Sequence, residues 1–169
     1  MAKLNEQVYL NLRQALICGR LMPGRVVSLR GLAAELGVSA MPVREAVSRL
    51  AAEGALELNE RRITVPAMTQ ERLLDLIALR LAIEPGLARR AMKALGRVEL
   101  RELVALNAAT DRAIQTGDVE GYILSNYKFH RAIYGRSGWE VLIPLLDRIW
   151  RQMGPFLRIV YGRLGTTQL

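Results

Sequence analysis

A short predicted helix over residues 40–52 carries a face of small and basic side chains. At about 100° per residue, one side of this helix collects Ala40, Met41, Arg44 and Ser48, with Arg49 at its edge. An arginine near the N-terminal end of a helix in the DNA major groove can bind guanine through two hydrogen bonds. The spacing therefore predicts that Arg44 reads a base edge in DNA.

The opposite side of this helix is apolar, which indicates where it packs. Its apolar residues are Val43, Ala46, Val47 and Leu50. A preceding helix is expected to begin after an N-cap at Ser28 and to end at Gly37, and Ser39 can cap the next one. Pro42 falls in the first turn, where a missing N–H costs nothing. Two short helices joined by a glycine-containing turn form the helix-turn-helix pattern.

The hydrophobic period changes after Gly54. Apolar residues then alternate with polar ones around the letters NERR, which predicts a small β-hairpin; they are Leu56, Leu58, Ile63 and Val65. The hairpin tip would present Arg61 and Arg62 to DNA phosphates or to the minor groove. Arg30 would contact the DNA backbone beside the major groove. Together with a first helix over residues 5–19, the two short helices and the hairpin predict a winged helix-turn-helix over residues 1–68. The alternative is a small helical bundle with ordinary surface arginines.

The remaining residues, 69–169, have helical periodicity throughout. A long helix capped by Thr69 is expected first, marked by Leu73, Leu76, Ile77 and Leu81, with a kink before Pro85. Three more helices follow: one marked by Leu100, Leu103, Leu106 and Ile114, one over residues 118–134, and one from Trp139 to about residue 160. The predicted fold is mainly α, with an antiparallel all-α unit after the winged unit.

Composition excludes several classes of protein. The 24 Lys and Arg residues outnumber the 16 Asp and Glu residues, and a net charge of +8 favours an anionic partner such as nucleic acid. No apolar run reaches the length of about 18 residues needed for a membrane span. One cysteine and no signal peptide predict a cytoplasmic protein. A single histidine, with no glycine-rich phosphate loop, argues against an enzyme.

The segment LRGLAAELGVSAMPVREAVSRLAAEGALEL, from residue 29 to residue 58, resembles the winged helix-turn-helix of the GntR family of bacterial transcription regulators. The matches to the usual family pattern are ungapped and include Ser39, Pro42, Val43, Arg44, Glu45, Ala46, Arg49, Leu50, Glu53 and Gly54. The resemblance implies DNA contacts by Arg30, Arg44 and Arg49, assisted by the wing. Many members have a DNA-contacting arginine where this chain has Ala40. Specificity is therefore expected to depend more on Arg44, on Arg49 and on apolar contact from Met41 to a thymine methyl.

Residues 69–169 resemble the all-helical FCD sensor domain of the FadR-type branch, through LIALRLAIEPGLARRA, TGDVEGYILSNYKFHRAIY and LIPLLDRIWRQM. The resemblance implies a small carboxylate effector and, in many members, a divalent metal held by an Asp, a His four residues later and two further histidines. Here Asn126 replaces the Asp, and His130 is the only histidine, so the ligand set is incomplete. The domain is expected to be C-terminally incomplete.

The roles of His130 and Arg80 in the expected sensor domain each have more than one interpretation. His130 would be a pocket or core histidine hydrogen-bonded by Asn126, a polar contact to the effector, or a metal ligand. Arg80 would face the effector cavity or form an i, i+4 ion pair with Glu84.

The preferred hypothesis is a metabolite-responsive homodimer that binds an inverted-repeat operator. The alternative is a helical interaction protein with a degenerate sensor that associates with full-length homologues.

Overall fold

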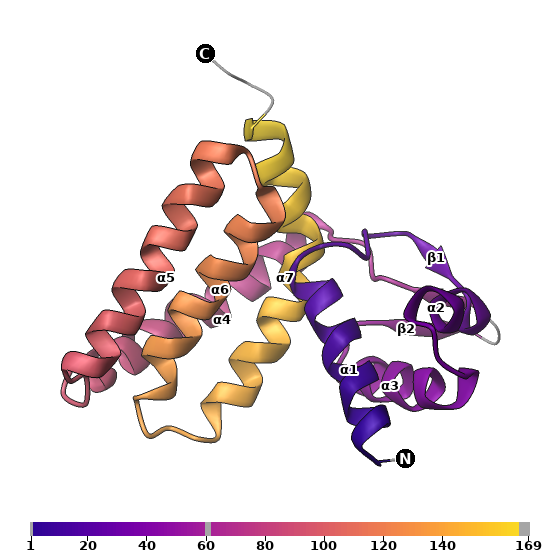
Figure 1. Cartoon of the computed structure of the whole chain (residues 1–169), viewed down its shortest axis with the longest axis horizontal. Coiled ribbons are helices and arrows are strands. Elements are labelled where there is room, and N and C mark those ends of the chain that lie inside the picture. The colour runs from indigo at the N-terminus through magenta and orange to yellow at the C-terminus, as the bar shows by residue number, and fades with distance from the viewer. Residues whose placement is uncertain (1, 60–61, 166–169) are drawn as a thin grey trace.

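The computed structural model describes residues 2–59 and 62–165, and over these residues the chain is mainly α-helical (Figure 1). The elements follow in the order α1 (Ala2–Ile17), β1 (Val26–Val27), α2 (Leu29–Leu36), α3 (Ala40–Ala52), β2 (Glu57–Asn59), β3 (Arg62–Thr64), α4 (Gln70–Ala91), α5 (Arg97–Thr116), α6 (Val119–Gly135) and α7 (Leu142–Gly165). The predicted fold class, a winged helix-turn-helix followed by a helical unit, is confirmed. In the described part of the chain, no helix is both long and apolar enough to cross a membrane.

The turn between α2 and α3 has the chemistry predicted for it. The Ser28 hydroxyl accepts a hydrogen bond from the Gly31 N–H at 3.0 Å and so caps α2. Gly37 ends α2 in the left-handed region at φ 65°, a conformation that favours glycine. Ser39 occupies the N-cap position of α3, but its side chain makes no capping hydrogen bond, so that part of the prediction was wrong.

The apolar side of α3 is the centre of the N-terminal core. Val43 and Leu50 are completely buried, and Ala46 and Val47 nearly so. They pack with residues of α1, α2 and the sheet, including Leu16 and Ile63. Because one side of α3 is fully used by this core, its other side is held toward the solvent.

The wing is a three-stranded antiparallel sheet in the order β1-β3-β2. The predicted hairpin corresponds to β2 and β3, with Leu58 opposite Ile63. Strand β1 was not predicted, because two residues show no periodicity and the pairing of Val27 with Ile63 depends on a partner far along the chain. The hairpin tip, with the predicted contact residue Arg61, lies outside the described residues.

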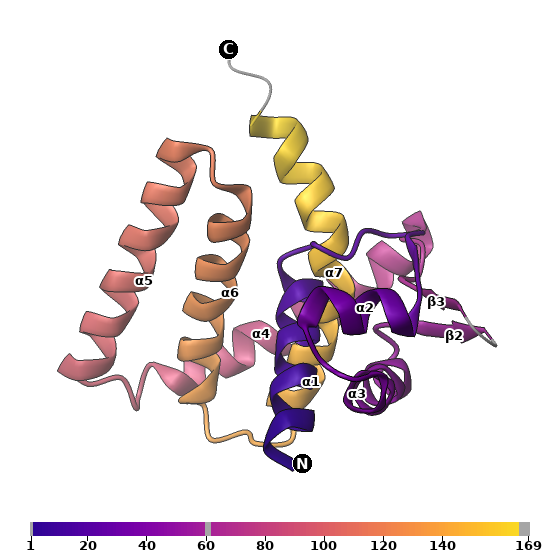
Figure 2. The same ribbon diagram turned by 45° about the vertical axis from the view of Figure 1, so that its right-hand side comes forward.

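Helices α4–α7 form the second unit. In both views α6 lies between α5 and α7, and α4 packs against α6 and α7 (Figures 1 and 2). Helix α4 runs through Pro85 to Ala91, so this proline does not end it. Helix α7 begins at Leu142 rather than at Trp139, which places Pro144 in the first turn, where its missing N–H costs nothing.

Several apolar residues that marked the predicted helices of this unit are exposed. Leu76 and Leu103 are buried, but Leu81 is 70% exposed and Ile114 is 61% exposed. Periodicity predicts that a helix has an apolar face, but not that a neighbouring element covers it. Among the described residues, these two positions remain uncovered.

The two units are joined directly through α1 and α7, which lie side by side (Figure 2). A Cβ atom at Gly154 of α7 would lie 2.3 Å from the carbonyl oxygen of Ile17 and 2.4 Å from that of Leu16. The contact is therefore made by backbone against backbone, at a distance that only glycine allows.

Candidate nucleic-acid interface and sensor cluster

The exposed side of α3 presents the residues that the sequence singled out. Ala40, Met41, Arg44 and Ser48 are all exposed, and Met41 keeps 65% of its surface accessible. Within residues 2–59 and 62–165, the Arg44 guanidinium makes no hydrogen bond or ion pair. A fixed helix with an unpaired arginine and an exposed methionine can offer donors and apolar contact to base edges.

Arg49 is placed differently from Arg44. Its Nη1 lies 2.9 Å from Glu6 of α1, its Nε lies 3.7 Å from the Glu53 carboxylate, and its guanidinium stacks 3.6 Å above the Tyr9 ring. The side chain stays half exposed. Sequence reasoning missed these partners because two of them come from α1, which is far from Arg49 in sequence.

Two further predicted contact residues, Arg30 and Arg62, are exposed. Arg30 is the second residue of α2, and Arg62 is the first residue of β3. Neither side chain is paired within the part of the chain that the structure describes. With no partner among the described residues, both guanidinium groups can meet phosphates, which account for most hydrogen bonds between proteins and DNA.

In the helical unit, a group of side chains gathers where α4, α6 and α7 meet. We call this group the sensor cluster; its members are Arg80, Glu84, His130, Tyr134, Trp150 and Met153. Arg80 forms the predicted ion pair with Glu84, at 2.7 Å between Nε and the carboxylate. Its guanidinium also lies 4.7 Å from the centre of the Trp150 ring, and its Nη1 lies 3.8 Å from the Met153 sulfur. Beside this pair an open groove of about 240 Å³ is lined by Ile77, Arg80, Leu81, Glu84 and Pro85.

His130 belongs to the same cluster. The Tyr134 hydroxyl donates to Glu84 at 3.1 Å, so its oxygen is the acceptor for Nδ1–H of His130, also at 3.1 Å. The His130 ring lies 5.7 Å from the Trp150 ring. The predicted hydrogen bond from Asn126 was wrong: among the described residues the His130 partner is Tyr134, one turn later on α6, and Asn126 makes no hydrogen bond.

The residues around His130 do not fit the metal site that the resemblance implied. No group of three His, Cys, Asp or Glu side chains able to hold a metal occurs in the part of the chain that the structure describes. A transition-metal site needs three or four convergent donors. Asn126 supplies an amide in place of a carboxylate, and Nδ1 of His130 is used by Tyr134.

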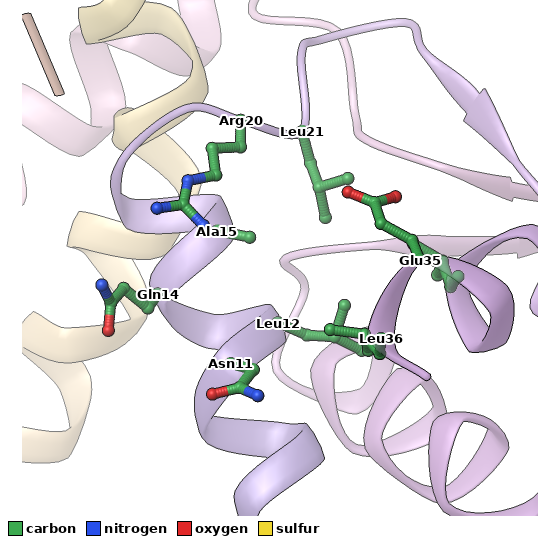
Figure 3. A pocket seen from close by; sticks show the side chains of 9 residues that line it. Asn11, Leu12, Gln14, Ala15, Arg20, Leu21, Glu35 and Leu36 are labelled. Atoms are coloured by element: carbon green, nitrogen blue, oxygen red, sulfur yellow. The ribbon is translucent and has the colours of Figure 1, made fainter. Parts of the chain in front are cut away.

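A separate hollow of about 280 Å³ lies between α1 and α2 (Figure 3). Leu12 of α1 and Leu36 of α2 point toward one another across it. Arg20, at its edge, is already paired with Glu120 of α6, at 2.9 Å from Nε. The lining is mixed, since Asn11, Gln14 and Glu35 join the leucines, and its one arginine is engaged in a contact between the two units.

Comparison with known proteins decides the family. The family described as "Bacterial regulatory proteins, gntR family" matches residues 4–65, and the FCD domain matches residues 75–168. The HTH-type transcriptional regulator McbR of Escherichia coli K12 is 33% identical over 167 residues, which cover 98% of this chain and 76% of McbR. The chain belongs to the GntR family.

Solved structures agree with this assignment. The Escherichia coli McbR/YncC structure superposes with a TM-score of 0.92 at 33% identity, over all of this chain and 80% of that one. A GntR regulator from Rhodococcus sp. RHA1, at 24% identity, has a TM-score of 0.71 and shows the same fold. The gluconate operon repressor of Bacillus subtilis is 25% identical, and the match covers 86% of this chain but 63% of that repressor's length.

Membership of the GntR family establishes the class of protein. The chain is a DNA-binding transcription regulator of the FadR-type branch, with an FCD domain, and it is not an enzyme. The individual DNA and effector contacts remain predictions.

The only histidine of this GntR-family chain offers a test of the sensor cluster. Burial lowers the pKa of His130 below its ordinary value of 6.5; Glu84 opposes this shift, and Arg80 adds to it. The folded protein then binds the proton less readily than the unfolded chain does. The free energy of unfolding should therefore contain a contribution that is fully present above pH 6.5 and is lost as the pH falls through the folded-state pKa.

We expect the imidazole resonance of His130 to titrate below pH 6.5 in NMR spectra. We also expect urea unfolding to show a smaller loss of stability between about pH 7 and pH 5 for His130→Phe than for the unmodified protein. The Phe variant, similar in shape, serves as the matched control. A resonance that titrates at or above 6.5 would contradict the buried placement of the ring.

Proposed function

We propose that this regulator binds an inverted-repeat operator as a homodimer in the cytoplasm, and that a small carboxylate metabolite changes its affinity for DNA. The observation that carries the DNA-binding mode is the exposed Arg44, which has no partner among the described residues, on a helix whose opposite side is buried. Residues 1–68 would form the DNA-binding unit, and residues 69–169 the sensing and dimerisation unit.

In this proposal the contacts divide into base readout and phosphate binding. Arg44 forms two hydrogen bonds with a guanine, and Met41 makes an apolar contact with a thymine methyl group. Phosphate contacts fix the helix in the groove. They come from Arg30, Ser39, Ser48, Arg61 and Arg62. Arg49 joins them where it exchanges its Glu6 partner for a phosphate.

The effector would enter the groove beside Arg80. The Arg80 guanidinium is held between Glu84, Trp150 and Met153, so its position is fixed before a ligand arrives. An entering carboxylate would replace Glu84 as the partner of Arg80, through a bidentate pair. His130 and Asn126, on the neighbouring helix α6, would supply further polar contacts.

Exposed apolar side chains on α4 and α5 support the assignment of dimerisation to the helical unit. Leu81, Val104 and Ile114 each keep at least 61% of their surface accessible. Exposed apolar surface of this kind marks interaction sites. Two-fold symmetry of a dimer would then require an inverted repeat in the DNA.

The proposal is tested by selecting duplexes from a randomised library with the purified chain, and by light scattering on the free protein. We expect enrichment of one inverted repeat, a dimer in solution, and an affinity that falls as the salt concentration rises. Failure to enrich any sequence would overturn the proposed operator binding. A monomer with weak DNA affinity that associates with longer GntR proteins would support the alternative, a helical interaction protein.

A further inference from the structure

Glu53 lies where three helices meet. It is the C-cap residue of α3, and its side chain is 13% exposed. Its carboxylate accepts hydrogen bonds from the Tyr9 hydroxyl of α1 at 3.0 and 3.3 Å and lies 2.8 Å from Nη2 of Arg151 of α7. Nε of Arg49, on α3 itself, lies 3.7 Å away. One carboxylate thus ties the end of α3, the recognition helix of the proposed operator binding, to α1 and to α7.

The partner of Glu53 on α7 is deeply buried. The Arg151 side chain is 4% exposed, and its Nε has no hydrogen-bond partner in the described part of the chain. Burial lowers the pKa of Arg151, and Glu53 is the strongest influence in the opposite direction. A charge buried this deeply is tolerated only beside a counter-charge. Arg151 therefore cannot separate from Glu53 without a large penalty, and the pair holds α3 and α7 in one arrangement.

Close contact between α1 and α7 reinforces the same arrangement. Gly154, one turn after Arg151, lets α7 meet the backbone carbonyls of Leu16 and Ile17 directly. Helix α1 also contacts the last turn of α3 at a second residue, where Glu6 pairs with Arg49. Since no flexible side chain separates the two backbones, a displacement of α7 must carry α1 with it, and so also α3.

Helix α7 contacts the sensor cluster with two residues that lie within two positions of Arg151. Trp150 lies under the Arg80 guanidinium, and Met153 contacts the same group through its sulfur. Trp150 also lies 5.7 Å from the His130 ring, measured between ring centres. Consecutive residues of α7 thus contact the proposed effector site and the end of the recognition helix.

We propose that Glu53 and Arg151 are positioning residues for DNA recognition, which hold α3 at the angle to α7 that presents Arg44 to the operator. The inference rests on the proposed operator binding. It assigns these two residues the link through which a shift of α7 at the sensor cluster reaches the recognition helix. Such a link is a coupling between two sites, and it must act equally in both directions.

The experiment compares Glu53→Gln, Arg151→Gln and the double variant with the unmodified protein. For each, the ratio of affinities is measured between the selected operator and a scrambled duplex of the same length, below the melting temperature. We expect each single variant to lower this ratio by about fivefold or more, and the double variant to recover part of it, because two amides can hydrogen-bond without a buried unpaired charge. Arg136→Gln is the matched control: Arg136 pairs with Glu99 at 3.3 Å, and its side chain is 48% exposed.

A purely structural role for the pair would lower the melting temperature of the single variants and leave the affinity ratio unchanged, which would overturn the inference. If the unmodified protein selects no operator, the proposed function fails, and this inference fails with it. If it does select one and the single variants keep its ratio, only the inference fails.

A second measurement covers single variants that do not fold. In a Trp139→Phe background, Trp150 is the only tryptophan, so its emission reports on α7 beside Arg151. We expect the operator to change this emission, the scrambled duplex to leave it unchanged, and the operator response to be smaller in the double variant than in the unmodified pair. If the Trp150 emission of the folded protein stayed unchanged on addition of the operator, the proposed link between α7 and α3 would be wrong.

Discussion

Replacing Arg44 with alanine is expected to weaken binding to the selected operator by about 1–3 kcal/mol, or about five- to 150-fold. The physical reason is the loss of two hydrogen bonds to a base edge, which no neighbouring side chain can supply. The preference for guanine over the other bases at one position of each half-site should also decrease, because the Arg44 contact is what distinguishes guanine from them. Anisotropy titrations against the operator and against single-position variants of it measure both effects.

The matched control for this prediction is Arg112→Ala. Arg112 is exposed on α5 in the helical unit, so this change removes the same charge away from α3. We expect it to leave the base preference unchanged and to alter the affinity only slightly, through the overall field. If Arg44→Ala bound like the Arg112→Ala protein, α3 would not be the recognition helix.

The second large effect expected is on stability, from Leu50→Ala. Leu50 is completely buried between α3 and the rest of the N-terminal core. Its truncation removes buried methyl groups and leaves a cavity, which costs about 2–5 kcal/mol of the free energy of unfolding. Urea unfolding monitored by circular dichroism gives this difference.

Leu58→Ala is the control for Leu50→Ala. Leu58 is the same residue type in strand β2, but it is 47% exposed, so its truncation should cost about 0.5 kcal/mol or less. Equal losses in the two variants would contradict the burial of the apolar side of α3. Operator binding by folded Leu50→Ala should persist, because the exposed side of α3 is unchanged.

Much of the DNA-binding unit could be predicted because its signals are local. The Ser28 cap bonds a residue three positions later, and the left-handed Gly37 ends α2 within its own turn. The apolar and polar sides of α3 follow from a period of 3.6 residues. The predicted exposure of Arg44 and burial of Leu50 were confirmed for this reason.

The sensor cluster was predicted only in part. The Arg80–Glu84 pair was one of two alternatives for Arg80, offered because residues four apart on a helix are neighbours, and the structure contains it. The same rule suggested Asn126 for His130, but Tyr134 lies at the same spacing on the other side and makes the contact. Periodicity also could not tell that Leu81 would lack a covering partner, because burial depends on another part of the chain.

The sequence by itself determined the family, the helix-turn-helix, the hairpin and the side of α3 that faces outward, because caps, turns and helical periods are encoded within a few consecutive residues. Only the tertiary structure decided that Arg49 is held by Glu6 and Tyr9, and that Glu53 meets Arg151. These partners are far apart in the chain, and their contact depends on the docking of α1 against α7. A long-range ion pair has no signature in local sequence, since its two residues become neighbours only when the helices pack.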